Sequence, residues 1–191
     1  MKKLMFSTVM CLLALTSQAQ TITKETVYQT YMDAASDSNG EYAYNAEIVD
    51  GVVNAQYVYR KEILSVHGNQ TAETLKPHLK HCYHYDGQGR LQKRTTLYWN
   101  AENNQWQNAY QLTYTYLPSQ NIVECSQWNS LTNSFKVPSE KMTYELTSDN
   151  TETSVASYIR KKSGQKFQLD YVMTIQAPML QEGILMTSIQ R

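Results

Sequence analysis

Alternation of apolar and polar side chains is the dominant pattern between residues 79 and 176. From Tyr110 to Tyr116, Tyr and Leu occupy the even positions, and Thr or Gln occupies every odd one. From Phe167 to Ile175 the period of two recurs, with Val172 as the exception. A period of two in segments rich in Tyr and Thr is typical of β-strands with one buried face. We therefore predict a β-sheet for this part of the chain.

Turn signals divide the pattern into consecutive strands. Asp86-Gly87-Gln88-Gly89 is a turn sequence, because its glycines accept positive φ and Asp bonds its own backbone. The predicted strands lie near residues 79–85, 90–99, 107–117, 121–129, 137–147, 151–160 and 166–176, with a possible last strand at 184–189. Segments 42–49 and 52–59 flank Asp50-Gly51 and predict an earlier hairpin. Segment 66–77 is expected to be a loop, and 22–32 fits either a helix or a strand.

Landmarks recur at an interval of about 30 residues. Trp99 and Trp128 are 29 residues apart, and so are Trp106 and Phe135. A fixed interval across several landmarks indicates internal duplication. We expect an all-β fold: an antiparallel β-meander of tandem two-strand units, forming a curled sheet or a partial barrel. Residues 20–78 are expected to be an N-terminal hairpin and loop region that packs on the sheet, and residues 79–191 the repeated meander.

The alternation predicts one dry face and one wet face for the sheet. The predicted dry face carries Tyr110, Leu112, Tyr114, Tyr116, Met142, Tyr144, Leu146, Leu169, Tyr171 and Met173. The predicted wet face carries Thr113, Thr115, Thr143, Glu145, Gln168, Asp170 and Thr174.

The first nineteen residues have the three parts of a secretory signal peptide. Lys2 and Lys3 precede an apolar run from Leu4 to Leu15, and Ser17-Gln18-Ala19 supplies small residues for cleavage. The run is shorter than the roughly 20 residues that a membrane anchor needs. We expect an exported protein, periplasmic or extracellular.

Charge narrows the range of partners. The chain has 17 basic and 17 acidic residues, and removing Lys2 and Lys3 leaves a net charge of −2. Nucleic-acid binding needs clustered Lys and Arg, so no nucleic-acid partner is expected. No other segment reaches the length of a transmembrane helix.

The aromatic residues are the candidate contacts for a glycan or a peptide. Tyr accounts for 15 of the 191 residues, and a Tyr ring can pack in a shallow core or stack on a ligand. The candidate ligand-binding residues are Trp99, Trp106, Trp128, Tyr114 and Tyr116. A purely structural role for these rings in each repeated unit is the alternative.

His78, Cys82 and His84 are a weak candidate for a metal site. They share one face of a predicted strand, but a closed structural zinc site needs about four ligands. We therefore expect no cofactor. A Cys82–Cys125 disulfide is disfavoured, because a simple meander separates the two residues by about 14 Å.

Enzymatic motifs are absent from the sequence. It contains no Gly-x-Ser-x-Gly, His-Glu-x-x-His or phosphate-binding loop. A glycan-acting hydrolase using a pair among Glu124, Glu140 and Glu145 is one alternative function. An eight-stranded outer-membrane barrel is another.

The string Tyr83-His84-Tyr85-Asp86, continuing through Gly89-Arg90-Leu91, resembles a YD repeat of the Rhs type. With the Trp-Asn-x5-aromatic pattern and the leader ending in Ser-Gln-Ala-Gln, the chain resembles small secreted Bacteroidetes proteins of a domain of unknown function. The resemblance covers residues 80–176. It implies an antiparallel meander and export, and it brings no catalytic residues. The resulting hypothesis is an exported, non-enzymatic binding or envelope-associated module.

Overall fold

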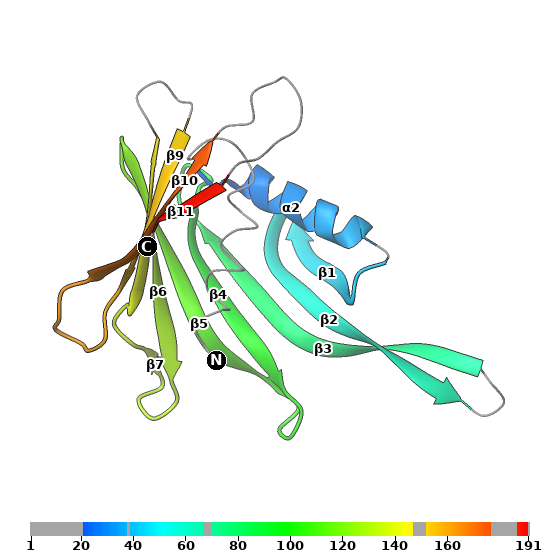
Figure 1. Ribbon diagram of the computed structural model, residues 1–191. Helices are drawn as coiled ribbons and strands as arrows, with labels where there is room; N and C mark the ends of the chain where they lie inside the picture. The colour runs from blue at the N-terminus through cyan, green and yellow to red at the C-terminus, as the bar shows by residue number, and fades with distance from the viewer. Residues whose placement is uncertain (1–20, 38, 67–69, 147–151, 177–186, 191) are drawn as a thin grey trace. The chain divides into compact units, whose positions relative to one another are not determined.

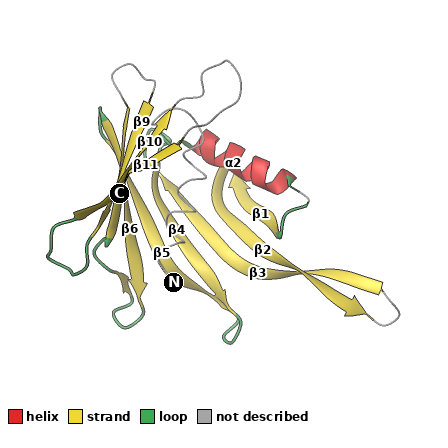
Figure 2. Ribbon diagram, viewed as in Figure 1, coloured by secondary structure: helices red, strands yellow, loops and turns green. Residues whose placement is uncertain are grey.

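Antiparallel strands and one helix make up the computed structural model, which describes residues 21–37, 39–66, 70–146, 152–176 and 187–190 (Figure 1). Figure 2 shows how far strands outweigh helix. The elements are α2 (Lys24–Ser36), β1 (Tyr42–Val49), β2 (Val52–Val66), β3 (Gln70–Tyr85), β4 (Leu91–Asn100), β5 (Gln105–Tyr116), β6 (Gln120–Asn129), β7 (Ser134–Phe135), β8 (Glu140–Leu146), β9 (Glu152–Ile159), β10 (Gln168–Gln176) and β11 (Thr187–Gln190). The predicted signal peptide lies outside the described residues.

The chain divides into two compact units. The first contains Ile22–Thr113 and Ser126–Lys136, and the second contains Tyr114–Cys125 and the chain from Val137 onward. Strands β5 and β6 each contribute residues to both units. The predicted boundary near residue 79 falls inside β3, and β3 belongs entirely to the first unit.

In the first unit, β1 to β5 pair in chain order and antiparallel. The predicted hairpin around Asp50-Gly51 is confirmed, since both residues have positive φ (51° and 75°) and Val49 pairs with Val52. A two-residue turn with positive φ at both positions matches the natural twist of a hairpin.

Helix α2 packs on β1 and β2 (Figure 1). Thr23 caps its first turn by accepting the N–H of Thr26 at 3.4 Å, and Glu25 complements the positive end of the helix. Val27 is the buried residue of the helix. These signals resolve the ambiguity between helix and strand at residues 22–32. The helix is 13 residues long, and no helix in the described chain is long and apolar enough to cross a bilayer.

In the second unit, β6 pairs with β8, and β8, β9, β10 and β11 then follow in order, all antiparallel. Its core contains Val123, Cys125, Met142 and Val155, each at most 4% exposed. The predicted all-β antiparallel meander is confirmed. The strand order has two ends, β1 and β11, and so does not close among the described strands.

The loop predicted at residues 66–77 is wrong, because β3 begins at Gln70. The polar half of β3 pairs residue by residue with β2, from Lys61↔Leu75 to Val66↔Gln70. This part of β3 is held by its backbone pairing with β2. Its side chains do not alternate between apolar and polar, so the sequence pattern could not predict a strand here.

Two face assignments in the second unit are also wrong. Leu169 is 58% exposed, although it was predicted on the dry face with Tyr171. The register shifts between Leu169 and Tyr171, which pair with the adjacent residues Tyr158 and Ser157, so the two side chains take opposite faces. Thr143, predicted to be wet, is buried at 5% exposure. Met142, next to it, is also buried, so β8 is covered on both faces there.

Candidate functional site

The candidate site lies in the first unit, where three aromatic rings from three strands form a continuous row. Trp99 of β4 pairs directly with Trp106 of β5, and their rings meet edge to face at a centroid distance of 5.1 Å. The ring of Tyr57, from β2, lies 6.0 Å from that of Trp106. All three residues are half-buried. We call Tyr57, Trp99 and Trp106 the aromatic row.

The aromatic row extends across several strands of the sheet. Strands β2 and β5 are three positions apart in the strand order, which corresponds to about 14 Å between their backbones. The rings of Tyr57 and Trp106 nevertheless meet, so both side chains must extend sideways over β3 and β4. The rings of Tyr57 and Trp106 are inclined to each other by 59°, and those of Trp99 and Trp106 by 68°, so the row is a set of contacting rings and not one flat plane.

A lysine and a carboxylate extend the row at its Tyr57 end. Lys80 of β3 pairs with Tyr57, and its Nζ lies 4.6 Å from the centre of that ring. Lys80 Nζ also donates a hydrogen bond to the Tyr57 hydroxyl at 2.7 Å and lies 3.8 Å from Glu47 Oε1. The Tyr57 hydroxyl in turn donates to Glu47 Oε1. The three side chains form one polar relay, Lys80–Tyr57–Glu47.

The relay shifts the pKa values of Tyr57 and Lys80. The hydrogen bond to Glu47 raises the pKa of Tyr57, because the carboxylate favours the protonated phenol. Burial disfavours the charge on Lys80, but the contacts with Tyr57, Cys82 and Glu47 outweigh it and raise the pKa of Lys80. Lys80 is therefore a fixed cation beside the aromatic row.

The turn between β4 and β5 fixes the Trp99–Trp106 pair. Asn100 Oδ1 accepts the N–H groups of Glu102 and Asn103 at 2.9 and 3.3 Å. Asn104 adopts positive φ (54°), a conformation that Asn tolerates better than most residues. The Asn100 side chain and the backbone conformation of Asn104 thus stabilise the turn that brings the rings of Trp99 and Trp106 together.

The β6–β7 turn has the same construction. Trp128 pairs with Phe135, their rings meet edge to face at 4.9 Å, and Asn129 Oδ1 accepts the N–H of Leu131. Asn133 has positive φ (48°). Both turns belong to the first unit and lie at the same end of its strands (Figure 1). The tandem duplication of the sequence stays a prediction, but these two turns are built alike.

The five predicted ligand-binding residues therefore do not form one cluster in the structure. Trp99 and Trp106 come together, whereas Trp128 packs on Phe135 in the other hairpin. Tyr114 is only 4% exposed on the dry face, so its ring is not presented at the surface, and its contact with a ligand stays a prediction. Tyr116 is half-buried in the second unit.

Sequence reasoning missed Tyr57, Lys80 and Glu47. Tyr57 and Lys80 are 23 residues apart and meet only through the β2–β3 register. Only a correct prediction of the β2–β3 register would have brought these residues together.

The metal candidates do not converge. A register shift between Val58 and Tyr59 leaves His78 between the paired residues of β3, and its ring stacks on Tyr42 at 5.5 Å. His84 is exposed. Among the side chains that the structure describes, no group of three or more His, Cys, Asp or Glu is placed to hold a metal ion.

Cys82 is a free thiol, so no disulfide joins it to Cys125. Its backbone pairs with Ala55 on one side and Thr95 on the other. Burial raises the pKa of this thiol, which keeps it protonated and poorly nucleophilic.

The three carboxylates of the hydrolase alternative do not form a catalytic pair. Glu124 pairs with Lys141, so it lies on the opposite face from Glu140, the residue next to Lys141. Glu145 pairs with Gln120, four positions from Glu124 along the strand, or about 13 Å. Glycosidase carboxyl pairs lie within about 9.5 Å of each other.

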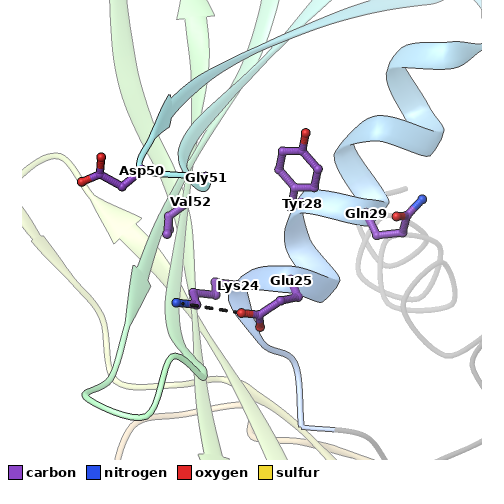
Figure 3. Close-up of a pocket in the computed structure, with 7 residues that line it drawn as sticks. All are labelled: Lys24, Glu25, Tyr28, Gln29, Asp50, Gly51 and Val52. Carbon is purple, nitrogen blue, oxygen red and sulfur yellow. Dashed lines mark ion pairs between the residues drawn. The ribbon is translucent and has the colours of Figure 1, made fainter.

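A shallow pocket of about 340 Å³ lies between the start of α2 and the β1–β2 turn. Figure 3 shows its lining, which consists of Lys24, Glu25, Tyr28, Gln29, Asp50, Gly51 and Val52. Lys24 and Glu25 pair with each other at 3.9 Å, and both are largely exposed. The pocket thus lacks the buried, convergent polar groups that orient a small ligand.

Comparison with known protein families identifies one family that matches most of the chain. The model of a family of unknown function, DUF3836, matches residues 1–146. The chain belongs to DUF3836. This agrees with the resemblance to uncharacterised Bacteroidetes proteins, whereas the likeness of residues 83–91 to a YD repeat stays a prediction.

Solved structures of Bacteroidetes proteins are similar to this DUF3836 chain. A protein of unknown function from Bacteroides fragilis is 20% identical with a TM-score of 0.56, over 71% of this chain and 93% of its own. A DUF3836 protein from Bacteroides vulgatus is 29% identical with a TM-score of 0.44, over 52% and 93%. One from Parabacteroides distasonis is 19% identical with a TM-score of 0.46, over 55% and 89%. The first supports the fold, and no curated protein matches the chain.

Proposed function

We propose that this DUF3836 protein is an exported, non-enzymatic binding module that holds a glycan on the aromatic row. The supporting observation is that the rings of Tyr57, Trp99 and Trp106 form one row of contacts that ends in the Lys80–Tyr57–Glu47 relay. Export rests on the predicted leader at residues 1–19.

A glycan suits this surface because a sugar ring has both an apolar and a polar side. The C–H groups of a pyranose pack against an aromatic face, and its hydroxyls donate to and accept from the groups around it. The aromatic row supplies the rings. The relay supplies a cationic donor in Lys80 and an acceptor in Glu47 at one end.

A long peptide fits less well. A peptide bound as an added strand uses the backbone of a sheet edge, but Trp99, Trp106 and Tyr57 lie on the face of a sheet whose strands are already paired. Adjacent rings on the face of a paired sheet favour stacking over strand addition.

Binding to a glycan array, followed by calorimetric titration of the strongest oligosaccharide, tests the proposal. We expect Trp106→Ala to weaken binding at least tenfold, because Trp106 touches both other rings. Trp128→Ala is the matched control: it removes the same ring from the other hairpin and should leave affinity unchanged. Circular dichroism confirms that both variants fold.

Two results would contradict the proposal. If the wild type binds no oligosaccharide on the array, the aromatic row is a packing feature only. If Trp106→Ala and Trp128→Ala weaken binding equally, a glycan site exists elsewhere.

A further inference from the structure

The β2–β3 hairpin continues beyond the strands that flank it. The pairing of β1 with β2 ends at Tyr42↔Arg60, and the pairing of β4 with β3 ends at Leu79↔Tyr98. The N–H of Lys61 still donates to the Glu41 carbonyl at 3.0 Å, and beyond it β2 and β3 pair only with each other among the described strands, as far as Val66↔Gln70. Figure 1 shows this two-stranded ribbon extending past β1 and β4. We call residues 61–66 and 70–75 the arm.

The arm exposes large apolar side chains. On one face Ile63 is 75% exposed and Leu75 52%, and on the opposite face Leu64 is 47% exposed. An isolated two-stranded ribbon is marginally stable in water, and exposed apolar side chains in a group indicate a contact surface. The arm therefore has the composition of an interface.

One face of the arm has a definite arrangement of charge. Lys61 pairs with Leu75, and two residues farther out Ile63 pairs with Glu73, so these four side chains share a face. They form a square in which the two apolar residues occupy one diagonal and the two charged residues the other. On the opposite face, Glu62 forms an ion pair with Lys76 at 2.6 Å.

We propose that this face of the arm binds the same face of a second copy of the chain. A two-fold axis along the Ile63–Leu75 diagonal places Ile63 of one copy against Ile63 of the other, and Leu75 of one copy against Leu75 of the other. The same rotation places Lys61 of each copy against Glu73 of the other. The square is therefore complementary to itself, which is the requirement for a two-fold interface.

The geometry of the contact follows from the axis. Strands run obliquely to the diagonal of the square, so the two arms cross at roughly a right angle, one of the two common ways in which sheets pack. Four side chains per copy form a small interface, well below the roughly 800 Å² per partner of a standard one. The dimer is weak and depends on concentration.

Sedimentation velocity of the full-length protein over a wide concentration range is the test. The wild type should shift from monomer to dimer as concentration rises. Ile63→Asp and Leu75→Asp should each weaken association at least tenfold. Leu131→Asp is the matched control, because Leu131 is 94% exposed in the β6–β7 turn, away from the arm, and association should not change.

A charge exchange tests the two-fold arrangement itself. Lys61→Glu and Glu73→Lys should each weaken the dimer by placing like charges together. The double variant should restore it, because the pairs are again opposite in sign. A wild type that stays monomeric at every concentration, or a dimer unaffected by Ile63→Asp and Leu75→Asp, would overturn the proposal. A double variant as weak as the single ones would also overturn it.

Discussion

Both carboxylate oxygens of Asp86 accept hydrogen bonds from Arg90: Oδ1 accepts the backbone N–H at 3.0 Å, and Oδ2 accepts the Nε–H at 2.7 Å. These bonds lower the pKa of Asp86, the backbone hydrogen bond most strongly. The same turn holds the chain that enters α2, because Gly89 accepts the N–H of Lys24 and Leu91 donates to Ile22. The β3–β4 turn is thus the anchor of the helix start.

Gly89→Ala should destabilise the protein, whereas Gly87→Ala should not. Gly89 has φ of 75°, whereas a Cβ there would make only an ordinary van der Waals contact of 3.6 Å with the side chain of Lys24, so the backbone conformation is the cause of the loss. A left-handed conformation costs an L-residue about 1–2 kcal/mol, so we expect a loss of that size in the free energy of unfolding. Gly87 lies in the same turn with no atom within 4 Å and without positive φ. Urea denaturation of both variants is the measurement, and equal losses would refute the role of the turn.

His81 should make the protein less stable as pH falls below neutrality. Burial, followed by the charges of Arg94 and His78, lowers the pKa of His81 to about 3, and its ring lies 3.0 Å from the Thr96 hydroxyl. Between about pH 6.5 and pH 3 the unfolded chain binds a proton that the folded chain does not, so acidification favours unfolding. His81→Gln should flatten this dependence in denaturation curves recorded from pH 7 to pH 4.

His84→Gln is the control for this measurement, because His84 is exposed on the same strand. The control should keep the slope of the wild type. A His81→Gln protein with an unchanged slope would show that other groups cause the acid sensitivity.

Leu112→Ala should cost about 2–5 kcal/mol of unfolding free energy, the usual range for removing a fully buried leucine. Leu112 is 1% exposed in β5. Leu131→Ala, at a side chain 94% exposed, should change stability by less than about 0.5 kcal/mol. Thermal or chemical denaturation distinguishes the two, and similar losses would contradict the assigned core.

Tyr57→Phe should lower the pKa of Lys80, because the variant keeps the ring but removes the hydroxyl that accepts the hydrogen bond of Lys80. We also expect a loss of about 1 kcal/mol in stability from the missing hydrogen bond. Titration of Lys80 by NMR measures the pKa. Tyr98→Phe is the control, because its hydroxyl donates to Gln107 and not to Lys80. An unchanged pKa in Tyr57→Phe would show that the relay does not hold Lys80.

Most strands could be predicted from the sequence, because the period of two reports directly on burial of one face. The predicted strands at 90–99, 107–117 and 121–129 coincide with β4, β5 and β6 within two residues at each end. The outer half of β3 could not be predicted, since only pairing with β2 forms it.

The candidate site could be predicted only where local sequence builds it. Trp99 and Trp106 meet through one short turn, so their proximity follows from a hairpin. The relay does not, because Glu47, Tyr57 and Lys80 come from three strands. Register shifts add a further obstacle: a single inserted residue near His78 or Asp170 reverses every face assignment beyond it.

The Asp50-Gly51 turn also has a consequence for the order of folding. Each strand from β1 to β5 pairs with its neighbour in the chain, so little loop entropy is lost at any step. The two-residue turn has the backbone conformation that a hairpin needs, so β1 and β2 can pair within microseconds. Pairing between distant parts of the chain is slower. We therefore expect this hairpin to form early and to become stable only when β3 and α2 pack against it.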